Sequence, residues 1–94
     1  MRLIGLSTLH AFCEKHSDCK SWVRNWIADV KTSKWESLND LKTRYPSASI
    51  LGGRIVIFNV KENSYRLATQ VTMGVQVVAV KWTGTHAEYS RRTF

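Results

Sequence analysis

The second half of the chain alternates between apolar runs and short polar breaks. Three runs rich in β-branched residues, RIVIFNV, YRLATQVT and VQVVAVKW, are separated by the breaks KENS and MG. Apolar runs of this length, joined by breaks this short, predict three consecutive antiparallel strands between Arg54 and Trp82. A polar segment, TGTHAEY, follows the last run and ends at Tyr89.

The first half shows helical periodicity instead. Apolar residues recur every three or four positions over residues 9–16 and 22–30, which predicts two amphipathic helices. Ser37 and Asp40 fit the start of a short third helix, and Pro46 ends it. The polar side of the second helix carries three cations, Lys20, Arg24 and Lys31.

Helices followed by a sheet indicate a two-layer α+β domain, with N-terminal helices packed on an antiparallel sheet. Short strands are expected at residues 2–4, which we place in the same sheet, and at residues 47–51. Gly52-Gly53 forms a tight turn into the first long strand. Because 94 residues are enough for one modest core, we expect a single domain spanning residues 1–94.

The two turns predict which residues face one another across the long strands. If Glu62-Asn63 centres the first turn, Asn59 lies opposite Arg66. If Met73-Gly74 centres the second, Thr72 faces Val75 and Arg66 lies opposite Lys81. A row of Asn59, Arg66 and Lys81 then crosses one face, and directly opposed residues share a face. The other face holds apolar residues, among them Phe58, Leu67, Val80 and Trp82.

The opposed cations of this row carry a cost, because like charges facing each other on a sheet repel. A phosphate between Arg66 and Lys81 would remove the repulsion, and arginine binds phosphate through two parallel hydrogen bonds. Two solvated charges at the end of a sheet are the alternative. Pattern alone leaves both interpretations open.

Composition points to a polyanionic partner. The net charge is +7 and the pI is about 9.9, and small basic domains commonly bind nucleic acid. No run of about twenty apolar residues is present and the start lacks the pattern of a signal peptide, so we expect no membrane association and a cytoplasmic location. Cys13 and Cys19 are expected to be reduced thiols.

One set of residues has the composition of a metal site. His10, Cys13, His16 and Cys19 are each three positions apart. Each three-residue step on a helix turns the side chain by about 300°, so the first and last would point to opposite sides. They could converge only if the helix broke near Ser17. We expect Cys13 to be a core residue and the protein to need no metal or other cofactor.

The segment after the last strand carries groups suited to proton transfer. Gly84 allows the chain to turn, and His86 and Tyr89 share one side if a helical turn follows. With Arg66 and Lys81 nearby, they supply what RNA cleavage needs: a base for the 2′-hydroxyl, cations for the phosphorane and an acid for the leaving oxygen. The alternative is a C-terminal turn in which the same residues only cap the sheet.

Four pieces of the sequence, YPSASILGGRIVIFNV, YRL, WTGTHAEY and KTSKWESLNDLK, resemble the HigB family of RelE-like toxins. The similarity covers nearly the whole chain, in order and at the spacing of the family. It implies helices on one side of an antiparallel sheet, with the RNA site on the open side. It also implies a toxin that cleaves mRNA, usually on the translating ribosome, and is neutralised by a HigA-like antitoxin.

The resemblance carries over residue by residue. Arg66 in YRL, and His86 and Tyr89 in THAEY, match motif positions and are expected to be catalytic. Asn59 matches the FN motif and is expected to contact RNA or to orient Arg66. Four further cations are expected from the predicted register and from the need for positive charge, and not from the resemblance: Lys81 as a catalytic residue, and Lys61, Arg91 and Arg92 as RNA contacts.

The chain departs from its relatives at two places near this site. Glu62-Asn63-Ser64 precedes YRL where many relatives have Gly-Asn, and Ser90 follows the tyrosine where relatives tend to have aspartate. The alternative function is therefore a non-catalytic basic module that binds RNA or the ribosome, or a decayed toxin that acts only through its partner. A pure binding module needs arginine and lysine, but it does not need His86 with Tyr89.

Overall fold

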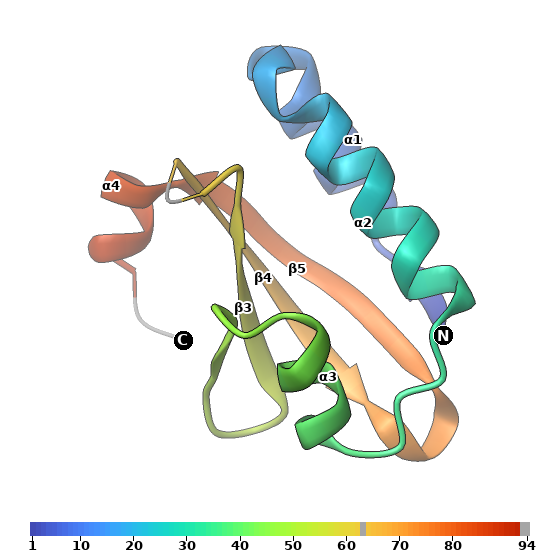
Figure 1. Cartoon of the computed structure of the whole chain (residues 1–94). Coiled ribbons are helices and arrows are strands. Elements are labelled where there is room, and N and C mark those ends of the chain that lie inside the picture. The colour runs from blue at the N-terminus through green and yellow to red at the C-terminus, as the bar shows by residue number, and fades with distance from the viewer. Residues whose placement is uncertain (63, 93–94) are drawn as a thin grey trace.

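The computed structural model describes residues 1–62 and 64–92, and Asn63 and residues 93–94 lie outside this description. The elements in chain order are β1 (Arg2–Ile4), α1 (Leu6–Lys15), a 3-10 turn η1 (Ser17–Cys19), α2 (Lys20–Thr32), α3 (Leu38–Arg44), β2 (Ser49–Ile50), β3 (Ile55–Val60), β4 (Tyr65–Thr72), a second 3-10 turn η2 (Met73–Val75), β5 (Val77–Thr85) and α4 (His86–Ser90) (Figure 1).

The described strands form one five-stranded sheet in the order β1-β5-β4-β3-β2. Strands β2 to β5 are antiparallel neighbours, as the short breaks predict. Strand β1 joins the sheet as expected, but it runs parallel to β5, because α1 and α2 return the chain across the sheet before the meander begins. The sheet is therefore mixed, and the α+β fold class is confirmed.

Helices α1, α2 and α3 contribute side chains to one core on a single face of the sheet. Trp26 of α2 packs edge-on against Phe58 of β3, with ring centroids 5.4 Å apart. Leu41 of α3 is also fully buried in this core, together with Leu67 of β4. The face without these helices, called the open face below, carries the side chains that alternate with the core residues.

The third helix begins as its sequence predicts. Ser37 is the N-cap, and its hydroxyl accepts a hydrogen bond of 3.3 Å from the Asp40 backbone N–H. The Asp40 carboxylate in turn accepts one from the Glu36 backbone N–H. The first of these bonds satisfies a donor that the first helical turn leaves unpaired, and the second fixes the residue before the cap.

The first predicted register is confirmed. Asn59 pairs with Arg66, Phe58 with Leu67 and Val60 with Tyr65. The turn between β3 and β4 contains Lys61 and Glu62, which both have positive φ angles of 48° and 63°. Asn63, the second residue of the predicted turn centre, lies outside the described residues.

The second predicted register is wrong. The connection between β4 and β5 is longer than two residues, because Met73–Val75 form a 3-10 turn and Gln76 adopts a left-handed conformation with φ of 55°. Thr72 consequently pairs with Val77 rather than with Val75. The Gln76 amide holds the turn by donating hydrogen bonds to the carbonyls of Trp35 and Met73.

A β-bulge then changes the pairing again further along β5. Thr69 pairs with Val80 but Ala68 pairs with Trp82, so Lys81 is an extra residue without a partner on β4. One extra residue reverses the alternation of side chains, which moves Trp82 from the predicted core face to the open face. Gly84, and not Lys81, lies opposite Arg66, so the predicted row of Asn59, Arg66 and Lys81 does not form.

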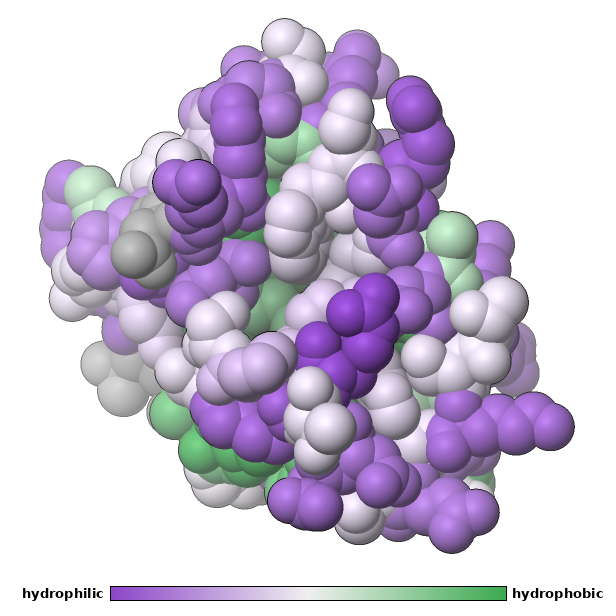
Figure 2. Space-filling view, viewed as in Figure 1, coloured by the Kyte–Doolittle hydropathy of each residue, from purple (hydrophilic) through white to green (hydrophobic). Residues whose placement is uncertain are grey.

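Hydrophilic side chains cover most of the molecular face seen in Figure 2, in keeping with the high charge of the sequence. Within the described part of the chain, no helix combines the length and the apolar character that crossing a membrane requires.

Candidate functional site

The short helix α4 positions the residues of the THAEY segment. Thr85 is its N-cap, and the Thr85 hydroxyl accepts a hydrogen bond from the Glu88 backbone N–H while the Glu88 carboxylate accepts one of 2.8 Å from the Thr85 N–H. This capping box lowers the pKa of Glu88 below its ordinary value of 4.5. Because α4 begins at His86, His86 and Tyr89 lie three residues apart on one helical turn, as predicted.

Arg66 projects from β4 onto the open face and is 9% exposed. Its Nη1 donates a hydrogen bond of 3.2 Å to the carbonyl of Tyr65, and its guanidinium carbon lies 5.9 Å from the centre of the Tyr89 ring. A guanidinium stays charged even when buried, and the face of a tyrosine ring attracts a cation. The structure therefore brings together two of the predicted site residues, from β4 and α4.

Trp82 and Arg92 complete a layered group around this pair. The rings of Trp82 and Tyr89 have centroids 6.4 Å apart, and the Arg92 guanidinium lies 5.1 Å from the centre of the Trp82 ring. We call Arg66, Trp82, Tyr89 and Arg92 the Arg66 cluster. Two adjacent aromatic rings with one cation on each side form a surface that can take up a phosphate and a nucleobase.

Gly84 makes room for the Trp82 ring. A β-carbon at this position would lie 2.3 and 2.4 Å from two carbons of the indole, which is closer than atoms can approach. Sequence reasoning placed Trp82 in the core and missed its role here. The signal that could have revealed it is the glycine itself, because glycine inside a strand often marks a bulge or a close approach.

His86 is exposed to solvent at the start of α4. Its backbone N–H donates a hydrogen bond of 3.3 Å to the carbonyl of Ser64, which ties α4 to the end of the β3–β4 turn. An exposed imidazole next to Tyr89 on the same helical turn is accessible to a substrate. The predicted His86–Tyr89 pair is therefore present, at the edge of the Arg66 cluster.

The predicted RNA contacts Asn59 and Lys61 lie outside the cluster, and so does Lys81, which was predicted to be catalytic. The Asn59 amide donates a hydrogen bond of 3.2 Å to the carbonyl of Ser47. The Lys61 ammonium lies 3.3 Å from the Asp18 carboxylate, on the helix-covered side. Lys81 is exposed at the bulge, where the corrected register removes it from the position opposite Arg66.

Arg91 is exposed directly after α4, and its backbone N–H donates to the Glu88 carbonyl at 3.2 Å. Its positive charge also contributes to the lowered pKa of Glu88. Of the two arginines after α4, Arg92 thus belongs to the Arg66 cluster, and Arg91 is its neighbour in the chain but is not part of the cluster.

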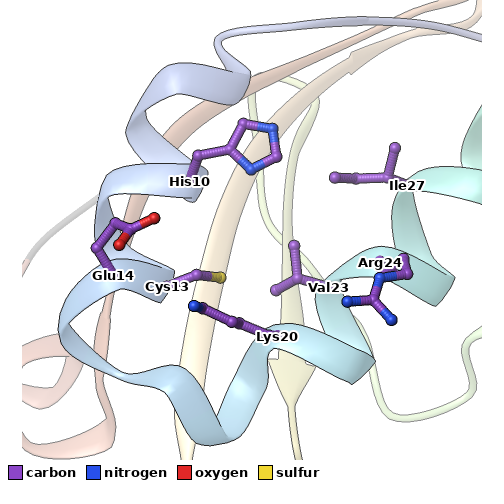
Figure 3. A pocket seen from close by; sticks show the side chains of 7 residues that line it. All are labelled: His10, Cys13, Glu14, Lys20, Val23, Arg24 and Ile27. Carbon is purple, nitrogen blue, oxygen red and sulfur yellow. The ribbon is translucent and has the colours of Figure 1, made fainter.

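The set of His10, Cys13, His16 and Cys19 does not form a metal site. The helix breaks at Ser17, yet across residues 1–62 and 64–92 no three histidine, cysteine or acidic side chains come close enough to hold a metal ion. Cys13 and Cys19 are buried with their sulfurs 3.5 Å apart, and burial raises the pKa of Cys19 to about 12. His10 points instead into a hollow between α1 and α2 (Figure 3).

Comparison with known proteins agrees with this architecture. A family model described as HigB toxin, the RelE-like toxic component of a toxin–antitoxin system, matches residues 19–92. The matched region runs from the start of α2 through the whole meander and α4. No curated protein matches the chain.

Proposed function

Because the chain belongs to the HigB family of RelE-like toxins, the toxic components of toxin–antitoxin systems, we propose that it is a metal-independent endoribonuclease that cleaves mRNA on the translating ribosome. The observation that supports this proposal most is the position of buried Arg66 against Tyr89, next to exposed His86. A fixed cation beside proton-transfer groups is the arrangement that phosphodiester cleavage requires. The proposal treats residues 1–94 as one toxin domain, in keeping with a core cluster that extends from Met1 to Val80.

In the proposed reaction, His86 acts as the base and removes the proton from a ribose 2′-hydroxyl. The 2′-oxygen then attacks the adjacent phosphorus, and the bond from phosphorus to the 5′-oxygen of the next nucleotide breaks. Arg66 stabilises the negative charge of the phosphorane, and the Tyr89 hydroxyl donates its proton to the departing 5′-oxygen. The products are a 2′,3′-cyclic phosphate and a 5′-hydroxyl.

The remaining cations are assigned to binding. Arg92 lies against the Trp82 ring, and in the proposed complex it binds an RNA phosphate next to the cleaved one. Exposed Lys81 and Arg91 add positive charge for the RNA backbone. Lys61 can also turn to RNA, because an exposed ion pair such as that with Asp18 contributes little stability. Asn59 would have to leave Ser47 to contact RNA.

The test is 5′-end mapping of a message in a translation extract, with and without the protein. We expect new 5′ ends that need ongoing translation and that disappear with His86→Ala, while exposed Arg54→Ala at the β2–β3 turn serves as the matched control. Binding of RNA without new ends would favour the alternative of a non-catalytic module. Cleavage of naked RNA at the same sites would contradict the role of the ribosome.

A further inference from the structure

A hollow of about 320 Å³ opens between α1 and α2. It lies on the helix-covered side of the sheet, whereas the Arg66 cluster lies on the open face. Figure 3 shows side chains of both helices directed into it. The residues that line it are His10, Cys13 and Glu14 of α1 and Lys20, Val23, Arg24 and Ile27 of α2.

The hollow combines an apolar floor with a rim that is basic on the α2 side and carries His10 and Glu14 on the α1 side. Cys13 and Val23 are buried and Ile27 is partly buried, while Lys20 and Arg24 are exposed. As far as the chain is described, neither Lys20 nor Arg24 forms an ion pair. Their charges are therefore available to an approaching acidic group.

The basic rim continues along α2. Lys20, Arg24, Ile27 and Lys31 are spaced by four, three and four residues, so they follow one side of the helix. The eleven residue-to-residue steps from Lys20 to Lys31 span about 16 Å along the helix, a length that three turns of a partner helix would match. A second hollow, lined by Lys31 together with Arg2 and Lys34, continues the positive surface at the far end. We call Lys20, Arg24 and Lys31 the α2 basic stripe.

We propose that the α2 basic stripe and its hollow bind an acidic, amphipathic segment of the antitoxin. Carboxylates of that segment would pair with the stripe, and an apolar side chain would enter the hollow beside Val23 and Ile27. The inference rests on the family assignment, which implies an antitoxin partner.

A protein segment fits this surface better than RNA does. An RNA backbone carries no apolar side chain for the floor of the hollow, and single-strand binding uses exposed aromatic rings. The aromatic residues of α2 are turned inward, with Trp26 buried and Trp22 partly buried against the core. Ile27, and not an aromatic residue, interrupts the stripe.

An antitoxin bound here leaves the Arg66 cluster uncovered, because the two surfaces lie on opposite sides of the sheet. Inhibition would then come from the bulk of the antitoxin, which keeps the toxin out of the ribosome. The surface thus predicts a complex in which binding of the antitoxin is insensitive to charge changes at Arg66.

The test is calorimetry with the purified antitoxin of the same toxin–antitoxin pair. We expect Lys20→Glu with Arg24→Glu to weaken binding about tenfold for each close charge pair that is lost, with a smaller effect at 1 M salt. Arg54→Glu is the control, because it reverses the charge of another exposed arginine at the opposite edge of the sheet. It should leave the affinity for the antitoxin within about twofold of the wild-type value. Thermal melting confirms that each variant is folded.

Three outcomes would overturn the inference. The first is unchanged affinity of the α2 double variant. The second is weakening by Arg66→Glu alone, which would show that the antitoxin fills the site. The third is loss of RNA cleavage by the α2 double variant in the absence of antitoxin, which would make the stripe an RNA or ribosome surface. Because the calorimetry contains no RNA, an inactive wild-type protein would refute the proposed function without affecting this measurement.

Discussion

At the scale of single residues, Arg66 is the side chain on which the proposed reaction depends most. We expect Arg66→Ala to reduce the cleavage rate on the order of a hundredfold or more, by analogy with removal of one oxyanion donor. Arg66→Lys should also be poor, because lysine lacks the paired donors of the guanidinium. Single-turnover cleavage measures the loss. A folded Arg66→Ala variant with full activity would remove this residue from the mechanism.

Gly84 offers a second test at the same scale. We expect Gly84→Ala to displace the Trp82 ring, since the new β-carbon would lie 2.3 Å from an indole carbon. The free energy of unfolding should fall by about 1–3 kcal/mol, as for other overpacked sites, and cleavage should fall with it. Gly74→Ala is the matched control, because a β-carbon there meets nothing within 4 Å. Denaturant unfolding measures the free energy of unfolding of both variants. Equal values for Gly84→Ala and Gly74→Ala would contradict a close contact between residue 84 and the Trp82 ring.

At the scale of elements, one hydrogen bond ties the corner between α1 and α2 to β4. The Tyr65 hydroxyl donates to the Asp18 carboxylate at 2.6 Å. This bond lowers the pKa of Asp18 below its ordinary 3.8 and raises the pKa of Tyr65 to about 12. The Asp18 contribution to stability is therefore present above about pH 4 and is lost as the pH falls through the lowered pKa. The Tyr65 contribution is present below pH 10 and is lost between pH 10 and 12.

Removal of that hydroxyl should change the pH dependence of unfolding. We expect Tyr65→Phe to lower the free energy of unfolding at pH 7, because the Asp18 carboxylate loses a hydrogen-bond donor. The difference from wild type should shrink below the pKa of Asp18 and again above pH 10. Denaturant unfolding of both proteins at pH 2, 7 and 11 measures this difference in the free energy of unfolding. The same difference at all three pH values would argue against a stabilising hydrogen bond between Tyr65 and Asp18.

At the scale of the whole molecule, the charge distribution predicts metal-independent chemistry. The Arg66 cluster supplies cations and aromatic rings, and Glu88 beside it is occupied by the capping box of α4. We expect EDTA to leave cleavage unchanged and the products to end in a 2′,3′-cyclic phosphate or a 3′-phosphate. End-group analysis of the fragments tests this. A requirement for added magnesium, with 3′-hydroxyl products, would replace the mechanism with a metal-assisted one.

The sequence by itself determined most of the architecture. Helical periodicity placed α1 and α2, the Ser37 cap placed α3, and the even turn between β3 and β4 set Asn59 opposite Arg66. These features depend on contacts between residues close together in the chain, so local patterns report them. The THAEY motif likewise placed His86 and Tyr89 on one helical turn, because the capping box of Thr85 and Glu88 is a local device.

The tertiary structure alone decided how β5 meets β4. The turn at Gln76 is held by a bond to Trp35, which is distant in sequence, and the bulge at Lys81 adds one residue within an apolar run that shows no break. The longer turn moved Lys81 away from the position opposite Arg66, and the extra residue of the bulge brought Trp82 to the open face beside Tyr89. Apart from the glycine at position 84, no local pattern reveals this, because the choice between two registers depends on packing across the whole sheet, where a slip of one residue exchanges every side chain between core and solvent.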